Sequence, residues 1–562
     1  MAKAIYTVLA NCQDCYRCVR ACPVKAIKVS GGQASIQEDL CIKCGTCVRE
    51  CPQRAKTVNS YVDEAKRLIQ SGQEVAASVA PSFAAQWGGV LAGRLPSALR
   101  QLGFKHVCET AEGAKYITEK ALSGEEFGNV CTACPVVINY IEMYKPDLMD
   151  VLIPVTSPMI AHGRMLKENY PGCAVVFIGP CAAKASEAQR PENTGAIDCV
   201  ITFAELQEWL KEENIDPNNC SESTFENIGQ LGESRLFPIQ GGMLKTGGVA
   251  SDGTDSEVIH ISGAEDVMGL LDSEDLSWRY RYVEPLFCKG GCINGPAFPD
   301  GSNVFDRRNR VIEYAKKPTL PSFRQRPEIS FTAYFTDESK KAEEVSETQI
   351  NKVYERTGKI DPQSRLNCGA CGYDTCLENA VAVARGLAEP EMCMPYMRRL
   401  AQQRTDRIIE TTPNGVVVLD SELCMIKMNP AFMKMFMCNN GILGRRISYL
   451  VNSDGYEKML AGLADDFQSI QSKYGIRYHE HLYALREDKQ YVGIYADISK
   501  IKYDEGQMDI VKTQTLMHAR EFLDHQIRFA QEMAHYLGKS TAQSEEIANR
   551  LISLYEEDDG AK

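Results

Sequence analysis

Short apolar runs alternate with amphipathic stretches through the middle of the chain. The runs EVAASVAP, AVVFIGP and IDCVITF have the length of buried strands, whereas FAELQEWLKEEN has the apolar spacing of a helix. Strands that alternate with helices are typical of α/β proteins. We therefore predict an α/β domain over residues 66–321.

Three apolar runs in this region lead directly to residues that can do chemistry. ASVAPS ends at Pro81 and Ser82, VVFIGPC ends at Cys181, and EPLFCKGGC carries Cys288 and Cys292. The ends of several strands converge where α/β proteins build their sites. We therefore expect these residues to lie close together.

The last third of the chain has a different pattern. β-rich runs such as IRYHEHLYAL and QYVGIYADIS predict an α+β domain over residues 401–502, and residues 503–562 read as helical. Ser540 and Gln543 form a capping box for a second helix in this tail. Apolar residues at heptad spacing precede it and favour a helical hairpin or coiled coil: Leu516, Leu523, Ala530 and Leu537.

Composition excludes several classes of partner. A chain of 562 residues needs several domains, so we expect a multidomain α/β and α+β protein. The formal net charge of −13 argues against nucleic acid as a partner. There is no run of 18 apolar residues to span a membrane and no signal-peptide pattern at the start, so a cytoplasmic location is expected.

The 23 cysteines are too many for a reduced cytoplasmic chain unless they bind metal. The pattern C-x2-C-x2-C-x3-C-P occurs twice near the start, as CQDCYRCVRACP and CIKCGTCVRECP. The fourth cysteine of each such run binds the other 4Fe–4S cluster. One cluster then takes Cys12, Cys15, Cys18 and Cys51, and the other takes Cys41, Cys44, Cys47 and Cys22. Structural zinc is the alternative, but two complete quartets interlock here. Residues 1–65 thus resemble a two-cluster bacterial ferredoxin, which would relay electrons.

Three further motifs resemble those of the di-iron (iron-only) hydrogenases. They are CTACP, GPCAAKASE and LFCKGGCINGP, in that order along residues 66–321. The resemblance implies an H-cluster, which is a 4Fe–4S cluster joined to a di-iron subsite with CO, cyanide and a bridging dithiolate. Its implied ligands are Cys134, Cys181, Cys288 and Cys292, of which Cys292 would also bridge to the di-iron subsite.

The same resemblance assigns roles to residues around the ligands. It implies that Lys184 hydrogen-bonds a cyanide and that Glu187 steadies this lysine. An ammonium group suits a small anionic ligand. Pro81 and Ser82 match a backbone wall around the dithiolate. The Gly-rich stretch GGMLKTGG at 241–248 resembles another wall, although such glycines can equally mark turns.

Four positions depart from the pattern of the fast hydrogenases. Ala133 stands where the family has a proton-relay cysteine, and Ile153 falls where the usual proton path has a serine. Gly179 and Leu286 replace two methionines. Loss of an acid–base relay predicts a slow enzyme. Cys131 and Glu119 are candidates for a substitute relay, although a free cysteine is more often a small buried apolar residue.

A third cysteine group lies beyond a predicted linker over residues 322–352. Its spacing is C-x2-C-x4-C-x16-C, and residues 353–400 resemble the small 4Fe–4S domains of electron-transfer flavoprotein complexes and corrinoid proteins. Zinc is again the alternative. The expected ligands of this third accessory cluster are Cys368, Cys371, Cys376 and Cys393.

The segment 401–502 resembles a PAS domain. Its strand pair, the helix start at Asn429 and the Asp497-Ile498-Ser499 junction carry this resemblance. A different small α+β domain is the alternative. His479 and His481 face one side of a strand and are interpreted as surface residues. Neither a kinase nor a phosphatase motif follows. Any signal must therefore pass to a separate protein, and a kinase or phosphatase is the expected partner.

We therefore weigh three functions. The first is a slow hydrogenase that senses hydrogen or redox state and signals through its 4Fe–4S and PAS domains to a kinase or phosphatase. The second is a metabolic hydrogenase that exchanges electrons with a partner such as ferredoxin. The third is a non-catalytic electron-transfer iron–sulfur protein. Hydrogen and protons are the expected substrates, and a homodimer through the PAS domain and the C-terminal helices is expected.

Overall fold

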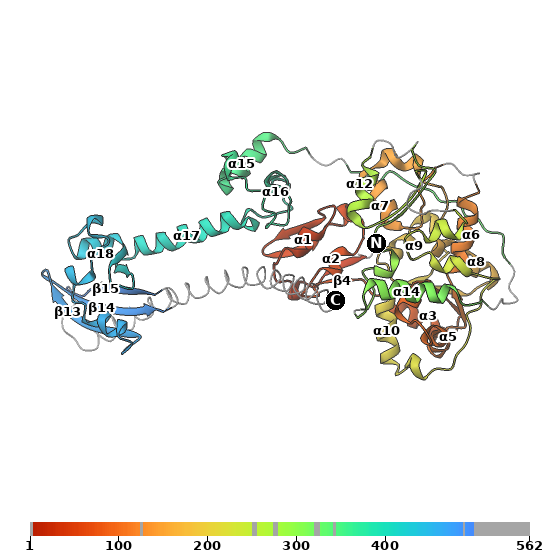
Figure 1. Ribbon diagram of the computed structural model, residues 1–562, viewed down its shortest axis with the longest axis horizontal. Helices are drawn as coiled ribbons and strands as arrows, with labels where there is room; N and C mark the ends of the chain where they lie inside the picture. The colour runs from red at the N-terminus through yellow and green to blue at the C-terminus, as the bar shows by residue number, and fades with distance from the viewer. Residues whose placement is uncertain are drawn as a thin grey trace, which may run out of the picture. The chain divides into compact units, whose positions relative to one another are not determined.

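The computed structural model describes residues 4–123, 128–249, 256–273, 279–299, 301–319, 326–340, 344–486 and 489–499. It divides into two units, Met1–Cys393 and Met394–Lys562. The first unit contains all three cysteine groups and the α/β domain (Figure 1). The predicted helical tail at 503–562 lies outside the described residues. Among the described helices, none is both long and apolar enough to cross a membrane.

A four-stranded parallel sheet forms the centre of the α/β domain. Its strand order is β6-β5-β7-β8, and each neighbouring pair is parallel. Every residue of β5 and β7 is buried, which explains the uninterrupted apolar runs of the sequence. The predicted α/β domain is confirmed. The strands are β5 (Val75–Val79), β6 (His106–Glu109), β7 (Ala174–Gly179) and β8 (Cys199–Thr202).

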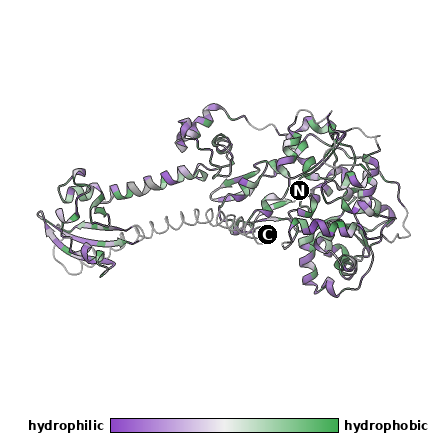
Figure 2. Ribbon diagram, viewed as in Figure 1, coloured by the Kyte–Doolittle hydropathy of each residue, from purple (hydrophilic) through white to green (hydrophobic). Residues whose placement is uncertain are grey.

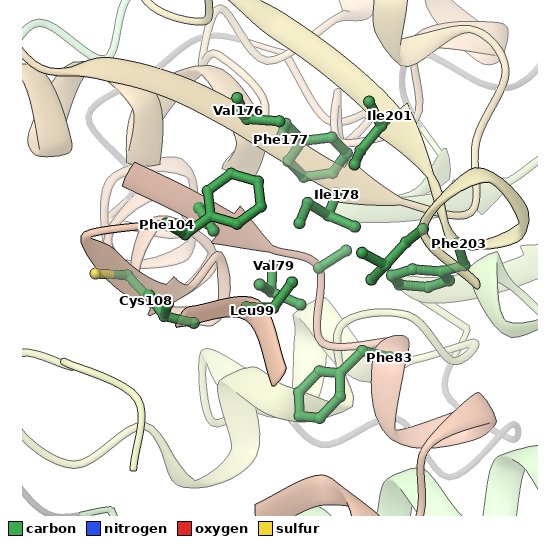
Figure 3. Close-up of a cluster of buried hydrophobic side chains, with 14 of the residues drawn as sticks. Val79, Phe83, Leu99, Phe104, Cys108, Val176, Phe177, Ile178, Ile201 and Phe203 are labelled. Carbon is green, nitrogen blue, oxygen red and sulfur yellow. The ribbon is translucent and has the colours of Figure 1, made fainter. Parts of the chain in front are cut away.

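Helices pack on this sheet and enclose its apolar core. In Figure 3 the side chains of Phe83, Phe104, Phe177 and Phe203 lie around Val79 of β5. Figure 2 shows polar and apolar residues interspersed along these helices, as expected for elements with one buried face. The helices that contribute residues to this core are α3 (Val62–Gln70), α4 (Phe83–Gln86), α5 (Leu91–Gln101), α8 (Pro158–Asn169), α9 (Lys184–Ala188), α10 (Phe203–Glu212) and α14 (Val304–Ala315). Helices α6 (Ala111–Ala121) and α7 (Pro135–Tyr144) contribute to separate apolar clusters.

A smaller parallel pair of strands extends the domain. It consists of β9 (Val258–Ser262) and β10 (Tyr282–Leu286), with α11 (Gly242–Thr246) and α12 (Ala264–Leu271) beside them. Val130 forms isolated parallel bridges with both Leu152 and Val283. The segment that leads into CTACP is therefore held against β10.

The N-terminal module repeats one small motif twice. The first copy supplies helix α1 (Arg17–Ala21), which is followed by the antiparallel strands β2 (Ile27–Ser30) and β3 (Gln33–Ile36), and the second copy supplies α2 (Thr46–Arg49). Strands β1 (Ile5–Thr7) and β4 (Lys56–Val58) join the two ends of the module in an antiparallel pair. Tyr16 and Gly45, which precede the two helices, both have left-handed backbone conformations. These conformations turn each cysteine loop sharply into its helix.

The predicted linker is in part attached to the α/β domain. Phe331 accepts a backbone hydrogen bond from Thr156 at 2.8 Å, and Ala333 donates one to Pro154 at 3.0 Å. Helix α15 (Glu347–Thr357) then begins inside the stretch assigned to the linker. The third cysteine group follows with α16 (Cys376–Ala384). The charged, Ser/Thr-rich composition therefore did not reveal that the segment around Phe331 and Ala333 is extended and hydrogen-bonded to the α/β domain.

The second unit contains the predicted α+β domain. Its five-stranded antiparallel sheet has the order β12-β11-β15-β14-β13. His479 and His481 are buried, so their interpretation as surface residues was wrong. The elements are α17 (Met394–Thr411), β11 (Gly415–Leu419), β12 (Met425–Met428), α18 (Pro430–Met435), α19 (Asp454–Leu460), β13 (Asp466–Lys473), β14 (Ile476–Leu485) and β15 (Gln490–Asp497).

Asn429→Ala should destabilise this second unit. The buried Asn429 side chain accepts from the amides of Val416 and Phe432 and donates to two carbonyls, those of Ile409 and Asn414. Loss of a helix cap together with unpaired buried backbone groups should cost about 2–4 kcal/mol. Hydrogen exchange of β11, measured by mass spectrometry, should accelerate accordingly. The exposed Asn452→Ala is the matched control, and equal exchange in both variants would contradict the prediction.

Candidate metal centre

A cavity of about 70 Å³ opens where β5 and β7 end. Ala80, Pro81 and Ser82 follow β5, and Pro180 and Cys181 follow β7. The structure thus brings together the ends of the apolar runs that the sequence singled out. The other lining residues are Thr110, Ala114, Ala133, Pro158, Met159, Phe177, Lys184, Phe237, Pro238, Leu286 and Cys292.

Four cysteines gather beside this cavity. Cys134 directly precedes α7, Cys181 follows β7, and Cys288 and Cys292 follow β10. The thiols of Cys181, Cys288 and Cys292 each lie within electrostatic range of Cys134. Burial raises the pKa of Cys181 to about 11 and that of Cys288 well above its ordinary value. Such thiols stay protonated unless a metal ion takes the place of the proton.

Lys184 and Glu187 form a buried ion pair at the cavity wall. They lie three residues apart on α9, and the Nζ–Oε2 distance is 2.6 Å. The Lys184 ammonium also donates to the carbonyl oxygen of Ala133 at 3.4 Å. An ammonium has three N–H donors. At least one donor therefore remains for an anionic group in the cavity, which fits the cyanide ligand that the hydrogenase resemblance implies.

The wall near Ala133 is apolar. Ala133 itself lines the cavity, and Ile153 is buried in an apolar cluster with Cys131. Burial raises the pKa of the Cys131 thiol above its ordinary value, so it resists losing a proton. Glu119 lies half-exposed at the surface and pairs with Arg326 at 3.0 Å. Neither candidate relay residue lines the cavity.

The other positions that the sequence singled out differ in whether they leave a polar group free or are constrained by close packing. The Ser82 hydroxyl is buried and has no hydrogen-bond partner among the described residues. At Gly179, an added Cβ would lie 2.6 Å from the ring of Phe177, so a longer side chain does not fit there. In the Gly-rich stretch, an added Cβ on Gly242 would lie 2.0 Å from the Leu236 carbonyl. That glycine is required by close packing of the backbone.

Glu284 is a buried carboxyl group that sequence reasoning missed. It lies on β10 and accepts the backbone amides of Met243 and Leu244, both at 3.1 Å. Burial raises its pKa to about 7, although these hydrogen bonds partly counter the effect. An acidic residue inside the apolar run YVEPLF was the available signal. Its carboxyl group holds α11 against β10.

The two N-terminal quartets are brought together in the interleaved arrangement. Cys18 lies within electrostatic range of Cys12, Cys15 and Cys51. Cys47 lies within range of Cys22, Cys41 and Cys44. Backbone amides also point at the sulfur atoms, as in the bonds from Ala26 to Cys22 and from Ala55 to Cys51, both 3.2 Å long. Such N–H···S bonds stabilise thiolates, so this donor set fits 4Fe–4S clusters.

The third cysteine group contains a buried lysine that the sequence did not reveal. The Lys359 ammonium lies 3.0 Å from the Sγ of Cys376, and it also interacts with Cys393. Burial alone would lower the pKa of Lys359, but the two sulfurs raise it overall. Cys371 lies within electrostatic range of Cys368 and Cys393. A positive charge thus lies against the predicted cluster ligands.

The second N-terminal quartet lies near both the cavity cysteines and the third cysteine group. Cys44 lies within electrostatic range of Cys288 beside the cavity. Cys22 lies within range of the buried Tyr373, which also interacts with Cys371. Tyr373 and Cys22 share one apolar core. The cysteine groups of the first unit are therefore contiguous, with Cys22 and Cys44 in the middle.

In the part of the chain that the structure describes, no three His, Cys, Asp or Glu side chains are grouped tightly enough to hold a single metal ion. Thiols of each quartet instead lie within electrostatic range of one another. Clusters of several irons are held by four such thiolates.

Three family matches cover separate parts of the chain. Residues 73–296 match the C-terminal domain of the iron only hydrogenase large subunit. Residues 11–56 match the 4Fe-4S dicluster domain, and residues 365–395 match an Fe-S cluster family. The matched ranges contain all sixteen cysteines assigned to clusters from the sequence.

Individual relatives share only parts of the chain. The NADP-reducing hydrogenase subunit HndD of Solidesulfovibrio fructosivorans is 26% identical over 318 residues, covering 45% of this chain and 54% of HndD. The cytosolic Fe-S cluster assembly factor NAR1 of Vanderwaltozyma polyspora is 39% identical over 121 residues, covering 21% of this chain and 22% of NAR1. The chain thus spans about half the length of HndD and about a fifth of NAR1.

One solved structure that the chain matches in part is a variant of FeFe-hydrogenase HydA1 from Chlamydomonas reinhardtii. It is 20% identical, with a TM-score of 0.36, and the match covers 45% of this chain and 88% of that one. Residues 73–296 thus resemble the C-terminal domain of the iron only hydrogenase large subunit, and residues 11–56 resemble a 4Fe-4S dicluster domain.

Proposed function

We propose that this protein binds an H-cluster on Cys134, Cys181, Cys288 and Cys292 and interconverts hydrogen with protons and electrons at a low rate. The cavity carries this proposal, because it places Cys181, Cys292 and the Lys184 ammonium around one small and otherwise largely apolar space. When bound, the di-iron subsite supplies the metal centre at which hydrogen is formed or split. The surrounding apolar residues exclude water from it.

The residues of the wall have distinct tasks in this proposal. Lys184 presents its remaining N–H donor to an anionic ligand, and Glu187 fixes the position of the ammonium at 2.6 Å. A buried charge of this kind is tolerated only when it is paired. Ala133 offers neither a donor nor an acceptor through its side chain. The low rate follows from the apolar surroundings of Ala133 and Ile153, which conduct no protons.

Electrons are proposed to move along the contiguous cysteine groups. The quartet that contains Cys22 and Cys44 lies between the cavity and the third group. The third group ends at Cys393, directly before the second unit begins at Met394. This order supports a sensory role, in which the redox state of the third cluster is passed to the PAS-like domain and then to a kinase or phosphatase. A homodimer formed through the second unit belongs to the same proposal.

Two other functions make different demands on the same residues. A metabolic hydrogenase that exchanges electrons with ferredoxin would need a fast proton supply. A non-catalytic iron–sulfur protein would need no di-iron subsite. The similarity to NAR1, which is named as an assembly factor, supports this second alternative over the 121 residues that match.

Infrared spectroscopy of protein matured with the full cofactor separates these functions. CO and cyanide stretching bands are expected in the wild type, together with slow hydrogen evolution. Iron analysis should give four 4Fe–4S clusters, including the one within the H-cluster, on sixteen cysteines. Full iron loading of the cysteines without any CO or cyanide band would favour the non-catalytic protein.

Lys184→Ala should weaken retention of the di-iron subsite. The change removes a charge-assisted hydrogen bond to a buried anionic ligand, a class worth roughly 1.5–3 kcal/mol. The infrared bands should lose intensity or shift relative to wild type. The control is Lys66→Ala, which removes a lysine on the surface of α3 that pairs with Glu212. Bands that are the same in both variants would show that Lys184 has a different role.

Ala133→Cys should raise turnover by much less than a complete relay, which is worth about 10²–10⁴-fold. The new thiol would stand at the cavity, but the buried Ile153 would leave an apolar gap beyond it. The double variant with Ile153→Ser should gain more than either single change. Hydrogen evolution is compared at matched infrared intensity. Turnover of hundreds per second in the wild type would instead support the metabolic function.

Lys359→Met should lower the reduction potential of the third cluster. A positive charge near a cluster favours its more negative reduced state, and the change removes that charge from beside Cys376. We expect at least a tenfold change in the reduction equilibrium, which is about 59 mV for one electron. A redox titration followed by electron paramagnetic resonance measures it. The exposed Lys352→Met is the control, and equal potentials in the two variants would refute the effect.

A further inference from the structure

A chain of buried polar side chains leads away from the cavity on the side of β5. Thr110 lines the cavity, and its Oγ1 lies 2.8 Å from the Oγ of Ser78. Ser78 lies 2.7 Å from Nδ1 of His162 on α8. The other ring nitrogen, Nε2, lies 3.4 Å from Oε2 of Glu112 on α6. These four side chains form one continuous series. Thr110 and Glu112 come from the N-cap and the first turn of α6, Ser78 comes from β5, and His162 comes from α8.

The burial of this series is costly. Ser78, His162 and Glu112 are each 0% exposed, and Thr110 is 2% exposed. A carboxyl group and an imidazole in an apolar core destabilise the fold unless they are paired, and even a paired set is often no better than apolar residues. Such a costly arrangement in contact with a cavity is a candidate for function.

Helix capping does not account for Thr110. It occupies the N-cap position of α6, where a threonine hydroxyl commonly accepts a hydrogen bond from the first turn. Here the side chain makes no such capping bond. Its hydroxyl is directed to Ser78 instead. The local stability of α6 is therefore not what positions this group.

The series has the chemistry of a reversible proton path. A hydroxyl donates one hydrogen bond and accepts others, so both hydroxyls can reverse their direction together. Neutral His162 with its proton on Nε2 faces the Glu112 carboxylate and accepts from Ser78 at Nδ1. Protonated His162 donates from Nδ1 to Ser78. Glu112 stabilises the imidazolium, as a carboxylate does beside a catalytic histidine.

We propose that Thr110, Ser78 and His162, with Glu112 as the positioning residue, form a proton relay that serves the cavity. This inference rests on the proposed hydrogenase function. In one transfer, Thr110 takes a proton from the cavity and gives its own to Ser78, which gives its own to Nδ1 of His162. One proton moves, no electron does, and each hydroxyl is restored. The relay replaces the path that Ala133 and Ile153 interrupt.

The relay also fits slow turnover. His162 and Glu112 are both fully buried, and Glu112 accepts a further hydrogen bond from the backbone amide of Ile228. The relay therefore stores one proton inside the protein. Exchange of that proton with water needs the surrounding structure to open. A store of this kind supplies single turnovers and does not support a high continuous rate.

The first test compares two threonines of the same region. Thr110→Val keeps the shape of the side chain and removes the hydroxyl at the cavity. Thr118→Val makes the same change on α6 at a buried residue whose hydroxyl donates to the Ala114 carbonyl. Thr110→Val should reduce hydrogen evolution by about tenfold or more at matched cofactor occupancy, and Thr110→Ser should recover most of the loss. Equal rates in the two valine variants would overturn the relay.

The second test does not depend on turnover. The CO and cyanide bands of the resting protein are recorded as pH is varied in wild type, His162→Gln and Thr118→Val. Glu112 is the carboxylate that faces the imidazole, Ser78 faces it from β5, and Glu109, next to Thr110, is neutralised by Arg235. A pH-dependent band shift should occur in wild type and Thr118→Val and be absent in His162→Gln.

The outcomes distinguish the relay from the function on which it rests. Bands in all variants with the same pH dependence would overturn the relay and leave the hydrogenase proposal intact. No bands in matured wild type would overturn the hydrogenase proposal, and the relay with it. If His162→Gln fails to fold, the comparison of Thr110→Val with Thr118→Val still decides.

Discussion

The burial of cysteine thiols is the constraint on which the first unit depends. Cys18, Cys22 and Cys47 lie in or beside apolar cores, and burial raises their pKa values, those of Cys18 and Cys22 to about 11. Thiols in such places are inert hydrophobic groups as long as they keep their protons. Iron in place of the proton converts them into thiolates that link separate loops. The cluster domains are then expected to be stable only together with their metal.

Buried lysine ammonium groups compensate part of the negative charge that such thiolates would carry. Lys184 stands beside the cavity cysteines, Lys359 lies against Cys376, and the buried Lys56 lies within electrostatic range of Cys18. Among the residues that the structure describes, Lys184 alone of these three has a carboxylate partner at hydrogen-bond distance. Each cation is expected to shift its site toward the reduced state, because it stabilises the added negative charge.

Two walls of the cavity differ in polarity. The wall that includes Ala133 continues into the apolar cluster of Ile153 and Cys131, where burial raises the pKa of the Cys131 thiol. The wall that includes Thr110 continues into hydroxyl, imidazole and carboxylate groups. A reaction that moves protons needs polar groups within hydrogen-bond reach. The geometry therefore favours β5 and α8 over the segment around CTACP as the source of protons.

The sequence by itself determined the cysteine spacing, the alternation of strands and helices, and the resemblance to the iron-only hydrogenases, because these depend on residues that are near one another along the chain. It also identified Lys184 and Glu187, which are three residues apart on one helix. It could not reveal the contacts between distant segments. Ser78 and His162 are 84 residues apart, and Lys359 and Cys376 are 17 residues apart, separated by the loop that carries Cys368 and Cys371. The hidden strand-like segment near Phe331 and the buried His479 and His481 likewise depend on what packs against them. Tertiary packing decided these features, since burial and pairing are set by neighbours in space.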